Sequence, residues 1–199
     1  MLQTAISSGN VNNGMIAFRM RPDPAAPTND MDPALLKRVI QPPTLRSQPS
    51  GNEIQIEAHL FGRFSVSVNG VSVAPCSSSA GWSTLAYLLA QQRTSVPVDV
   101  LEGIFWPDAS THAARNNRNV ALSHLRQALR LVSAHNIIEH HGGKYVFAQG
   151  CSLWTDAQDF EQCLANGRWL EANHRNEEAV ARYKAALSLY QDDFLVDEL

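Results

Sequence analysis

The segment from Thr111 to Arg130, THAARNNRNVALSHLRQALR, combines an apolar stripe with a polar face. Its aliphatic residues recur at helical spacing, at Ala114, Ala121, Leu122, Leu125 and Leu129. At about 100° per residue, these side chains fall on one side of a helix and must face a core. The pattern therefore predicts a long helix, ending near Leu131, that packs along one side and leaves the other side in solvent.

Strand patterns precede this helix. Apolar and polar residues alternate over residues 54–60 and again over 64–68, which is typical of half-buried strands. The dipeptide Asn69-Gly70 is a preferred two-residue hairpin turn, and Val71 begins a return strand. We expect the folded part of the chain to open with a small antiparallel sheet.

Two shorter helices and a second hairpin complete the pattern. A helical stripe over residues 82–89 follows three serines that can supply an N-cap. Residues 96–108, VPVDVLEGIFWPD, are expected to form a second helix that Pro107 ends. Beyond the long helix, two short strand patterns flank Gly142-Gly143 and predict a closing hairpin. This order of strands, three helices and a hairpin is that of a winged helix-turn-helix.

The N-terminal residues 1–52 differ from the rest of the chain in amino-acid composition. They hold seven of the ten prolines, mixed with Asn, Ser and Gly, so they form a core poorly and are expected to be a mobile arm. One exception is residues 32–43, DPALLKRVIQPP, where Asp32 can cap a short helix that Pro42 stops. That helix either packs on its own protein or serves as a docking peptide.

The long helix also carries the chemistry of a nucleic-acid contact. It holds Arg115, Arg118, Arg126 and Arg130 and no acidic residue. Its solvent side is expected to present Asn116, Asn119, Val120, Ser123, Gln127 and Arg130, flanked by His124 and Arg126. In the major groove, Asn and Gln amides pair with adenine, Val meets the thymine methyl, and Arg contacts guanine or phosphate. The alternative is a basic surface helix without a partner.

The closing hairpin predicts a wing. Its glycine turn lets the backbone approach a phosphate closely, and Lys144 can neutralise that phosphate. An ordinary hairpin would instead use Tyr145 only to cover the core. We expect both roles, with Tyr145 packed and Lys144 on phosphate.

The net charge of −3, from 16 basic and 19 acidic residues, argues on average against a nucleic-acid binder. The charge is segregated, however. Residues 1–52 carry five basic and three acidic residues, residues 53–150 carry seven and six, and residues 151–199 carry four and ten. The chain thus joins a basic helix to a strongly acidic tail.

That tail, residues 151–199, is expected to contain two amphipathic helices. Gly167, Ala179, Tyr183 and Ala186 have the spacing of a tetratricopeptide-type (TPR-like) helical hairpin. Any two-helix hairpin is the alternative, because one copy does not establish a repeat.

Several classes are disfavoured. The longest apolar runs fall far below the ~20 residues of a membrane span, and the N-terminus lacks the features of a secretory signal. Three cysteines without a CxxC pair suit reduced thiols in a cytoplasm. Adjacent His140 and His141 have no Cys at ligand spacing, so no zinc or other metal is expected. We find no phosphate loop, GxSxG or HExxH, and therefore expect neither an enzyme nor a cofactor.

Taken together, several segments resemble the bacterial regulators of the Streptomyces antibiotic regulatory protein type. The resemblance covers residues 54–199 and is carried by LFGRFSVSVNGVSV, LAYLLAQQ, FWPDAS, AARNNRNVALSHLRQALR, GGKYVF, and LWTDAQDFEQCLANG through ALSLYQDDFL. The implied fold is α+β: an OmpR-type winged helix-turn-helix with an N-terminal antiparallel sheet and a hairpin wing, over residues 53–150, followed by the all-α, TPR-like start of a bacterial transcriptional activator domain.

The resemblance implies a sequence-specific, cytoplasmic and nucleoid-associated transcriptional activator. Such proteins bind direct repeats in double-stranded promoter DNA, commonly as paired subunits, and contact RNA polymerase. By position, the recognition helix spans Arg115 to Arg130 and the wing Lys144 to Tyr145. The turn of Trp106, Asp108 and Ser110 is expected to face polymerase.

Three departures from the family pattern stand out. Gly81-Trp82-Ser83 replaces the basic residues usual before the first helix, which puts a phosphate contact there in doubt. Arg118 stands near the core phase where relatives carry Leu, so it either reaches solvent or this turn of helix is shifted. The chain stops at Leu199, where relatives continue, so we expect the start of a longer chain or a natural short form. A protein-interaction module, with a winged helix that no longer binds DNA, is the alternative function.

Overall fold

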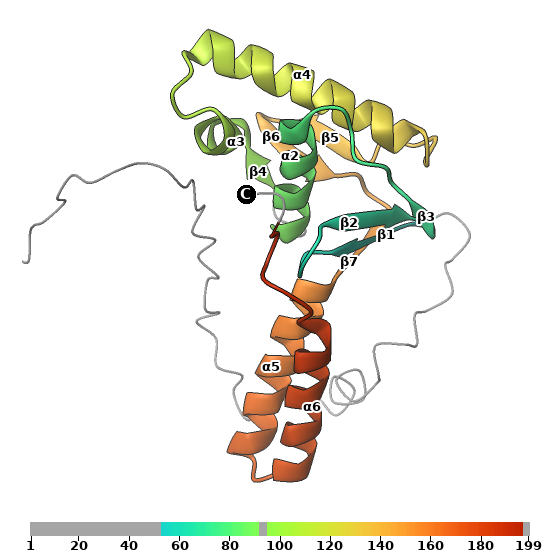
Figure 1. Cartoon of the computed structure of the whole chain (residues 1–199), viewed down its shortest axis with the longest axis vertical. Coiled ribbons are helices and arrows are strands. Elements are labelled where there is room, and N and C mark those ends of the chain that lie inside the picture. The colour runs from blue at the N-terminus through green and yellow to red at the C-terminus, as the bar shows by residue number, and fades with distance from the viewer. Residues whose placement is uncertain (1–52, 92–94, 197–199) are drawn as a thin grey trace, which may run out of the picture.

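The computed structural model describes residues 53–91 and 95–196. The expected N-terminal arm, with the short helix inside it, lies outside these residues. Figure 1 shows three parts: a small sheet in the middle, three helices with a second sheet at one end, and a two-helix hairpin that projects from the other end.

The first sheet is built from β1 (Ile54–His59), β2 (Ser65–Val68), β3 (Val71–Ser72) and β7 (Cys151–Thr155), in the order β3-β2-β1-β7. The predicted antiparallel hairpin is confirmed. Asn69 and Gly70 have φ angles of 50° and 78°, as a two-residue turn between twisted strands requires. The Asn69 side chain also accepts a hydrogen bond of 2.9 Å from the backbone N–H of Gln55.

Strand β7 was not predicted. It pairs in parallel with β1, with Ile54 opposite Cys151 and Ala58 opposite Thr155. Its partner lies far away in sequence, so no turn signal announces the pairing, and five residues are too few to show a clear period. Residues 151–155 therefore lie in the same sheet as the first strand, and the helical hairpin begins directly after them.

The three expected helices are α2 (Ser79–Ala90), α3 (Val98–Phe105) and α4 (Thr111–Arg130). Ser78 caps α2 by accepting from the N–H of Gly81 at 3.1 Å, as the serine run predicted. Helix α4 ends one residue before the expected limit, with Leu131 as its C-cap. Ala114, Ala121, Leu122, Leu125 and Leu129 are all buried, so the predicted core face of α4 is confirmed.

The second sheet has the order β4-β6-β5 and contains β4 (Val96–Pro97), β5 (Ile138–His141) and β6 (Lys144–Phe147). The β5–β6 hairpin was predicted. The expectation of helix from Val96 was wrong, because Val96 and Pro97 pair with β6 and the helix begins at Val98. Strand β4 is an edge strand, where proline is tolerated because the unpaired side of the strand needs no N–H donor.

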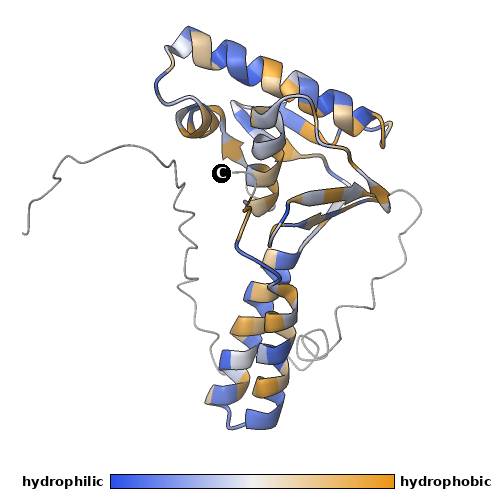
Figure 2. Ribbon diagram, viewed as in Figure 1, coloured by the Kyte–Doolittle hydropathy of each residue, from blue (hydrophilic) through white to orange (hydrophobic). Residues whose placement is uncertain are grey.

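Helices α5 (Asp156–Ala172) and α6 (Asn176–Leu189) form the projecting hairpin. Their contact requires Gly167, because a Cβ atom there would fall within 3 Å of three ring atoms of Tyr183. In Figure 2, apolar residues of both helices alternate with hydrophilic ones along the hairpin. The two amphipathic helices expected after residue 150 are therefore present, although β7 precedes them.

Asp156 joins the hairpin to the first sheet. Its buried carboxylate accepts hydrogen bonds from the N–H groups of Leu60 and Phe61 at the end of β1, at 2.7 and 3.2 Å. The chain after α6 returns to the same place, where the N–H of Leu195 donates to the Leu60 carbonyl at 2.8 Å. The ring of Phe61 contacts Phe160, Tyr190 and Phe194 edge-on, with ring centroids 5.2 to 6.1 Å apart.

Candidate nucleic-acid interface

Helix α4 lies along one end of the molecule (Figure 1), and its outer face is polar. The six residues expected there, Asn116, Asn119, Val120, Ser123, Gln127 and Arg130, are exposed, and so is Arg115. Val120 is an aliphatic side chain with 48% of its surface exposed among these polar groups. His124 and Arg126 flank the face and are half-buried, as their helical phase predicts. We call this set of nine side chains the α4 face.

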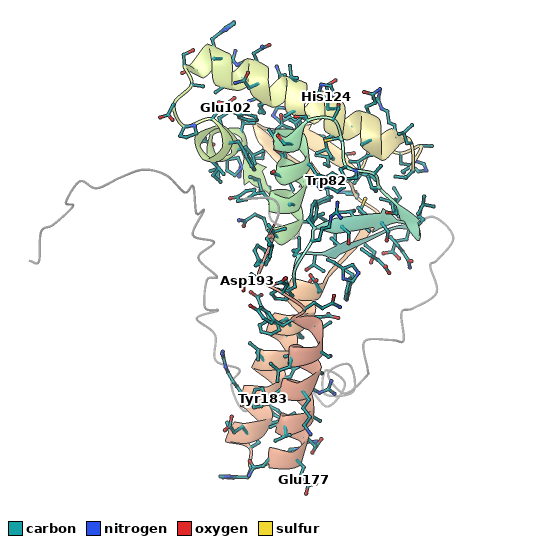
Figure 3. All side chains as sticks on the ribbon, in the orientation of Figure 1. Trp82, Glu102, His124, Glu177, Tyr183 and Asp193 are labelled. Atoms are coloured by element: carbon teal, nitrogen blue, oxygen red, sulfur yellow. The ribbon has the colours of Figure 1, made fainter. Side chains whose placement is uncertain are left out.

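His124 is held by a residue outside α4. His124 is labelled in Figure 3. Its Nδ1 atom is hydrogen-bonded at 2.9 Å to the hydroxyl of Ser77, a residue that precedes α2. The bond fixes the orientation of the imidazole ring at the edge of the α4 face. His124 can therefore use its other ring nitrogen toward a ligand.

Arg118 occupies the position where the sequence allowed a shifted turn. Helix α4 is continuous through this position, so the turn is not shifted. The Arg118 side chain is only 12% exposed and forms an ion pair with Glu102 of α3, with 2.5 Å between Nη1 and Oε1. Its Nη2 atom donates to Oδ1 of Asn119 at 3.1 Å. Glu102 is half-buried and lies 16 positions earlier in the sequence, so the helical periodicity of α4 alone could not reveal this partner.

The wing carries its two predicted residues on opposite sides. Gly142 and Gly143 have φ angles of 56° and 74°, conformations that glycine adopts without strain. Tyr145 is 4% exposed, and its ring lies 4.9 Å from the ring of His140, so its packing role is confirmed. Lys144 is exposed next to the turn, and its contact with phosphate stays a prediction.

The turn between α3 and α4 contains the residues expected to face polymerase. Asp108 is exposed, and Trp106 is half-buried with its ring 5.8 Å from that of Phe105. Ser110 is exposed as well, but its hydroxyl accepts from the N–H of Ala113 at 3.4 Å and so caps α4. A contact of Trp106, Asp108 and Ser110 with polymerase stays a prediction.

The start of α2 offers no basic side chain. Gly81 and Trp82 are both buried, and the Trp82 ring packs at 5.0 Å from Phe64. A Cβ atom at Gly81 would lie 2.6 Å from the carbonyl oxygen of Ala121 in α4. The close crossing of the two helices therefore leaves room for glycine only.

A shallow depression at the end of α4 adds two residues that the sequence analysis missed. It has a volume of about 220 Å³, open solvent included, and its polar lining comes from Arg126, Arg130, His135 and Asn136. Among residues 53–91 and 95–196, no acidic side chain forms a salt bridge with either arginine. His135 and Asn136 lie in the turn after α4, where no periodicity relates them to the helix. The depression extends the basic surface toward β5.

Two further features were sought in the part of the chain that the structure describes. There, no group of three or more His, Cys, Asp or Glu side chains is arranged to hold a metal ion. No described helix is long and apolar enough to cross a membrane. The three cysteines are free and half-buried. Burial raises the pKa of both the Cys151 and the Cys163 thiol above the ordinary value of 9.0.

Comparison with known proteins gives a likeness of fold. No protein-family model and no curated protein matches the chain. Among solved structures, Mycobacterium tuberculosis EmbR in complex with a low affinity phosphopeptide has a similar fold, with a TM-score of 0.60 at 22% sequence identity. The match covers 73% of this chain and 38% of EmbR, so the chain spans well under half the length of that protein. The likeness supports the α+β winged helix with a helical region.

Proposed function

We propose that this chain is a DNA-binding transcriptional activator of the Streptomyces antibiotic regulatory protein type, which inserts α4 into the major groove of promoter DNA. The observation that carries the proposal is the α4 face. It lies at the molecular surface and combines amides, a hydroxyl, guanidinium groups and one exposed valine, with no acidic residue in the helix. Base edges in the major groove offer the complementary acceptors, donors and thymine methyl groups.

The phosphate contacts in this proposal come from the edges of the α4 face. Arg126 and Arg130 border the depression at the C-terminal end of α4, and Lys144 is exposed on the wing. Contacts of this kind fix a protein on the duplex without reading its sequence. Arg115 and the arginines at the other end then flank the amides that read bases.

The acidic tail does not oppose this contact. Figure 1 shows that the α5–α6 hairpin projects from the end of the molecule opposite α4. Helix α5 has 17 residues and so extends the hairpin by about 25 Å at 1.5 Å per residue. That length exceeds the Debye length of about 10 Å at 0.1 M salt, so most of the negative charge is screened from DNA bound at α4.

Two protein partners belong to the proposal. RNA polymerase would meet the turn of Trp106 and Asp108, which stands at the start of α4. A second copy of the chain would bind the adjacent direct repeat, because linking two modest contacts raises the effective concentration of each. With Arg118 paired to Glu102, the other three arginines of α4 give a single subunit only a modest electrostatic contribution.

The test is selection of duplexes from a random pool by the full chain, followed by fluorescence anisotropy with the selected duplex. Affinity should fall steeply between about 50 and 200 mM salt, since each phosphate contact releases counterions. Arg130→Glu should weaken binding roughly tenfold or more. Lys184→Glu changes the net charge equally on the far hairpin and should leave binding nearly unchanged. Absence of any selected duplex, or equal effects of both reversals, would overturn the proposal.

A protein-interaction module is the second candidate, and the surface of α6 favours it. Val180 and Leu187 are exposed by 49% and 69% on this helix, an unusual apolar content for a solvated surface. Under this alternative, regulation in cells survives charge reversal at Arg130 but is lost with Leu187→Ser. Under the DNA-binding proposal, Arg130→Glu abolishes regulation.

A further inference from the structure

Three side chains form a relay between α3 and the α4 face. Glu102 of α3 accepts from Nη1 of Arg118, and Nη2 of the same guanidinium donates to Oδ1 of Asn119. Glu102 and Arg118 are largely buried, with 18% and 12% of their side chains exposed, whereas Asn119 lies in solvent. Figure 3 shows Glu102 beneath the N-terminal half of α4. The relay thus connects a half-buried acid with a residue on the surface expected to read DNA.

The relay fixes which end of the Asn119 amide is free. A guanidinium carries only donors, so the amide atom that faces Arg118 must be the oxygen. The Nδ2 amino group, with two N–H donors, is then left toward solvent. Glu102 keeps Arg118 in place through a charge-assisted bond, which is stronger than a bond between neutral groups.

The relay carries a free-energy cost that a purely structural contact could avoid. The Nε atom of Arg118 is buried and has no hydrogen-bond partner among residues 53–91 and 95–196. Replacing a buried ion pair by well-packed apolar side chains is often neutral or stabilising, so stability alone does not account for an arginine here. Its distinctive result is the fixed orientation of the neighbouring amide.

We propose that the relay makes Asn119 a donor-only reader, which favours guanine over adenine at the base pair it contacts. The inference rests on the proposed function, DNA binding by α4. An amide pairs with adenine through both of its ends, accepting from N6 and donating to N7. Guanine presents only acceptors, N7 and O6, which suit the free amino group. Pairing with adenine would require the amide oxygen to be shared with the guanidinium.

The neighbouring amides provide an internal comparison. Asn116 and Gln127 are exposed, and the structure records no hydrogen bond for either side chain within the described residues. Both can turn to pair with adenine, as the sequence predicted for all three amides. Glu102 and Arg118 act on Asn119 without touching DNA and are therefore positioning residues.

The test measures base preference at one position. The base pair that Asn119 contacts in the selected duplex is the one at which Asn119→Ala loses its base preference. Dissociation constants are then measured with each of the four bases at that position. The intact chain should prefer guanine to adenine by about tenfold, and Arg118→Leu should shift this ratio toward adenine by about the same factor. In the Asn119→Ala background, Arg118→Leu should leave the ratio unchanged, since the two residues act together.

A second variant separates orientation from charge and folding. Arg118→Lys keeps the positive charge, but one ammonium lacks the fork that serves Glu102 and Asn119 together. It should lose the guanine preference while the salt dependence of binding stays the same. An intact chain that prefers adenine at this position, or variants that weaken all four bases equally, would overturn the inference. Failure of the intact chain to bind any duplex would instead overturn the proposed function.

Discussion

Gly81 of α2 and Ala121 of α4 meet at a helix crossing that has no space for a side chain. A Cβ atom built on Gly81 would lie 2.6 Å from the backbone oxygen of Ala121, and 3.1 Å from Sγ of Cys76. The obstructing atom belongs to a helix backbone, which cannot move aside as a flexible side chain can. The crossing therefore sets the depth at which α4 sits on the core, and with it the position of the α4 face.

Gly81→Ala should destabilise the chain for this reason. Adding a methyl group to a filled contact costs typically 1–3 kcal/mol, so we expect a loss of about 2 kcal/mol in the free energy of unfolding. Gly103→Ala in α3 is the matched control, because a Cβ there meets nothing within 4 Å. That change should stabilise the chain by roughly 0.5–1 kcal/mol through better helix propensity. Urea unfolding of both variants checks the prediction, and equal effects would contradict it.

A similar contact closes the α5–α6 hairpin. A Cβ on Gly167 would lie 2.8 and 2.9 Å from Cδ1 and Cζ of the Tyr183 ring, and closer still to Cε1. Gly167→Ala should therefore cost about 1–3 kcal/mol. Because the obstacle is a side chain, the cost should shrink when Tyr183→Ala is present as well. A double-mutant cycle by thermal unfolding measures this coupling, and additive effects would show that the two residues act independently.

Asp156 should be more sensitive to substitution than its size implies. One carboxylate oxygen accepts from the N–H groups of Leu60 and Ala157, and the other accepts from Phe61. In Asp156→Asn, the side-chain amino group replaces one of the two oxygens and faces a backbone N–H, so two donors oppose each other and the hydrogen bond is lost. We expect a loss of roughly 1.5–3 kcal/mol, the range for hydrogen bonds to charged groups. Asp108→Asn, at an exposed turn position, should change the free energy of unfolding by less than about 0.5 kcal/mol.

The elements with strong local signals could be predicted from the sequence. The apolar stripe of α4, the Asn69-Gly70 turn and the glycine turn of the wing each depend on neighbouring residues, and all three are present. Strands β4 and β7 could not be predicted, because each is short and is defined by a partner remote in sequence. Both segments are strands only because they pair with a distant strand in the folded chain.

The same distinction applies to the candidate site. Helical phase depends only on the sequence of α4, and the six residues it placed on the solvent side are all exposed: Asn116, Asn119, Val120, Ser123, Gln127 and Arg130. It could not find Glu102 as the partner of Arg118, because that pair requires the packing of α3 against α4. His135 and Asn136 join the site through the turn after the helix, for which the sequence carries no pattern. Contacts between elements were thus the part that only the structure revealed.

Lys144 gives a test of the wing that is separate from α4. Under the proposed function, its ammonium neutralises one phosphate, so Lys144→Ala should lower the slope of log affinity against log salt by about one. The loss of affinity should be the same for all duplex sequences, since phosphates carry no base information. Lys184→Ala removes an equal charge from α6 and should leave the slope unchanged. A sequence-dependent effect of Lys144→Ala would contradict a phosphate contact.

The buried thiols predict a pH dependence. Burial raises the pKa of Cys151, with a further contribution from the charge of Glu139, and burial also raises the pKa of Cys163. At pH 8, the thiolate fraction of both groups is then smaller in the folded chain than in the unfolded chain. Because the thiolate is the reactive form, iodoacetamide should modify both residues slowly until urea unfolds the protein.

The effect on stability follows from the same shift. As the pH rises past 9.0, the ordinary pKa, the unfolded chain releases its thiol protons before the folded chain does. The unfolded state then binds fewer protons, so the free energy of unfolding should fall as the pH rises. Below the ordinary pKa, the stabilising contribution of the protonated thiols is fully present. Cys151→Ala should reduce this decline between about pH 8.5 and 10.5 when urea midpoints are compared with those of the intact chain. A decline that is equally steep without the thiol would contradict the assignment to Cys151.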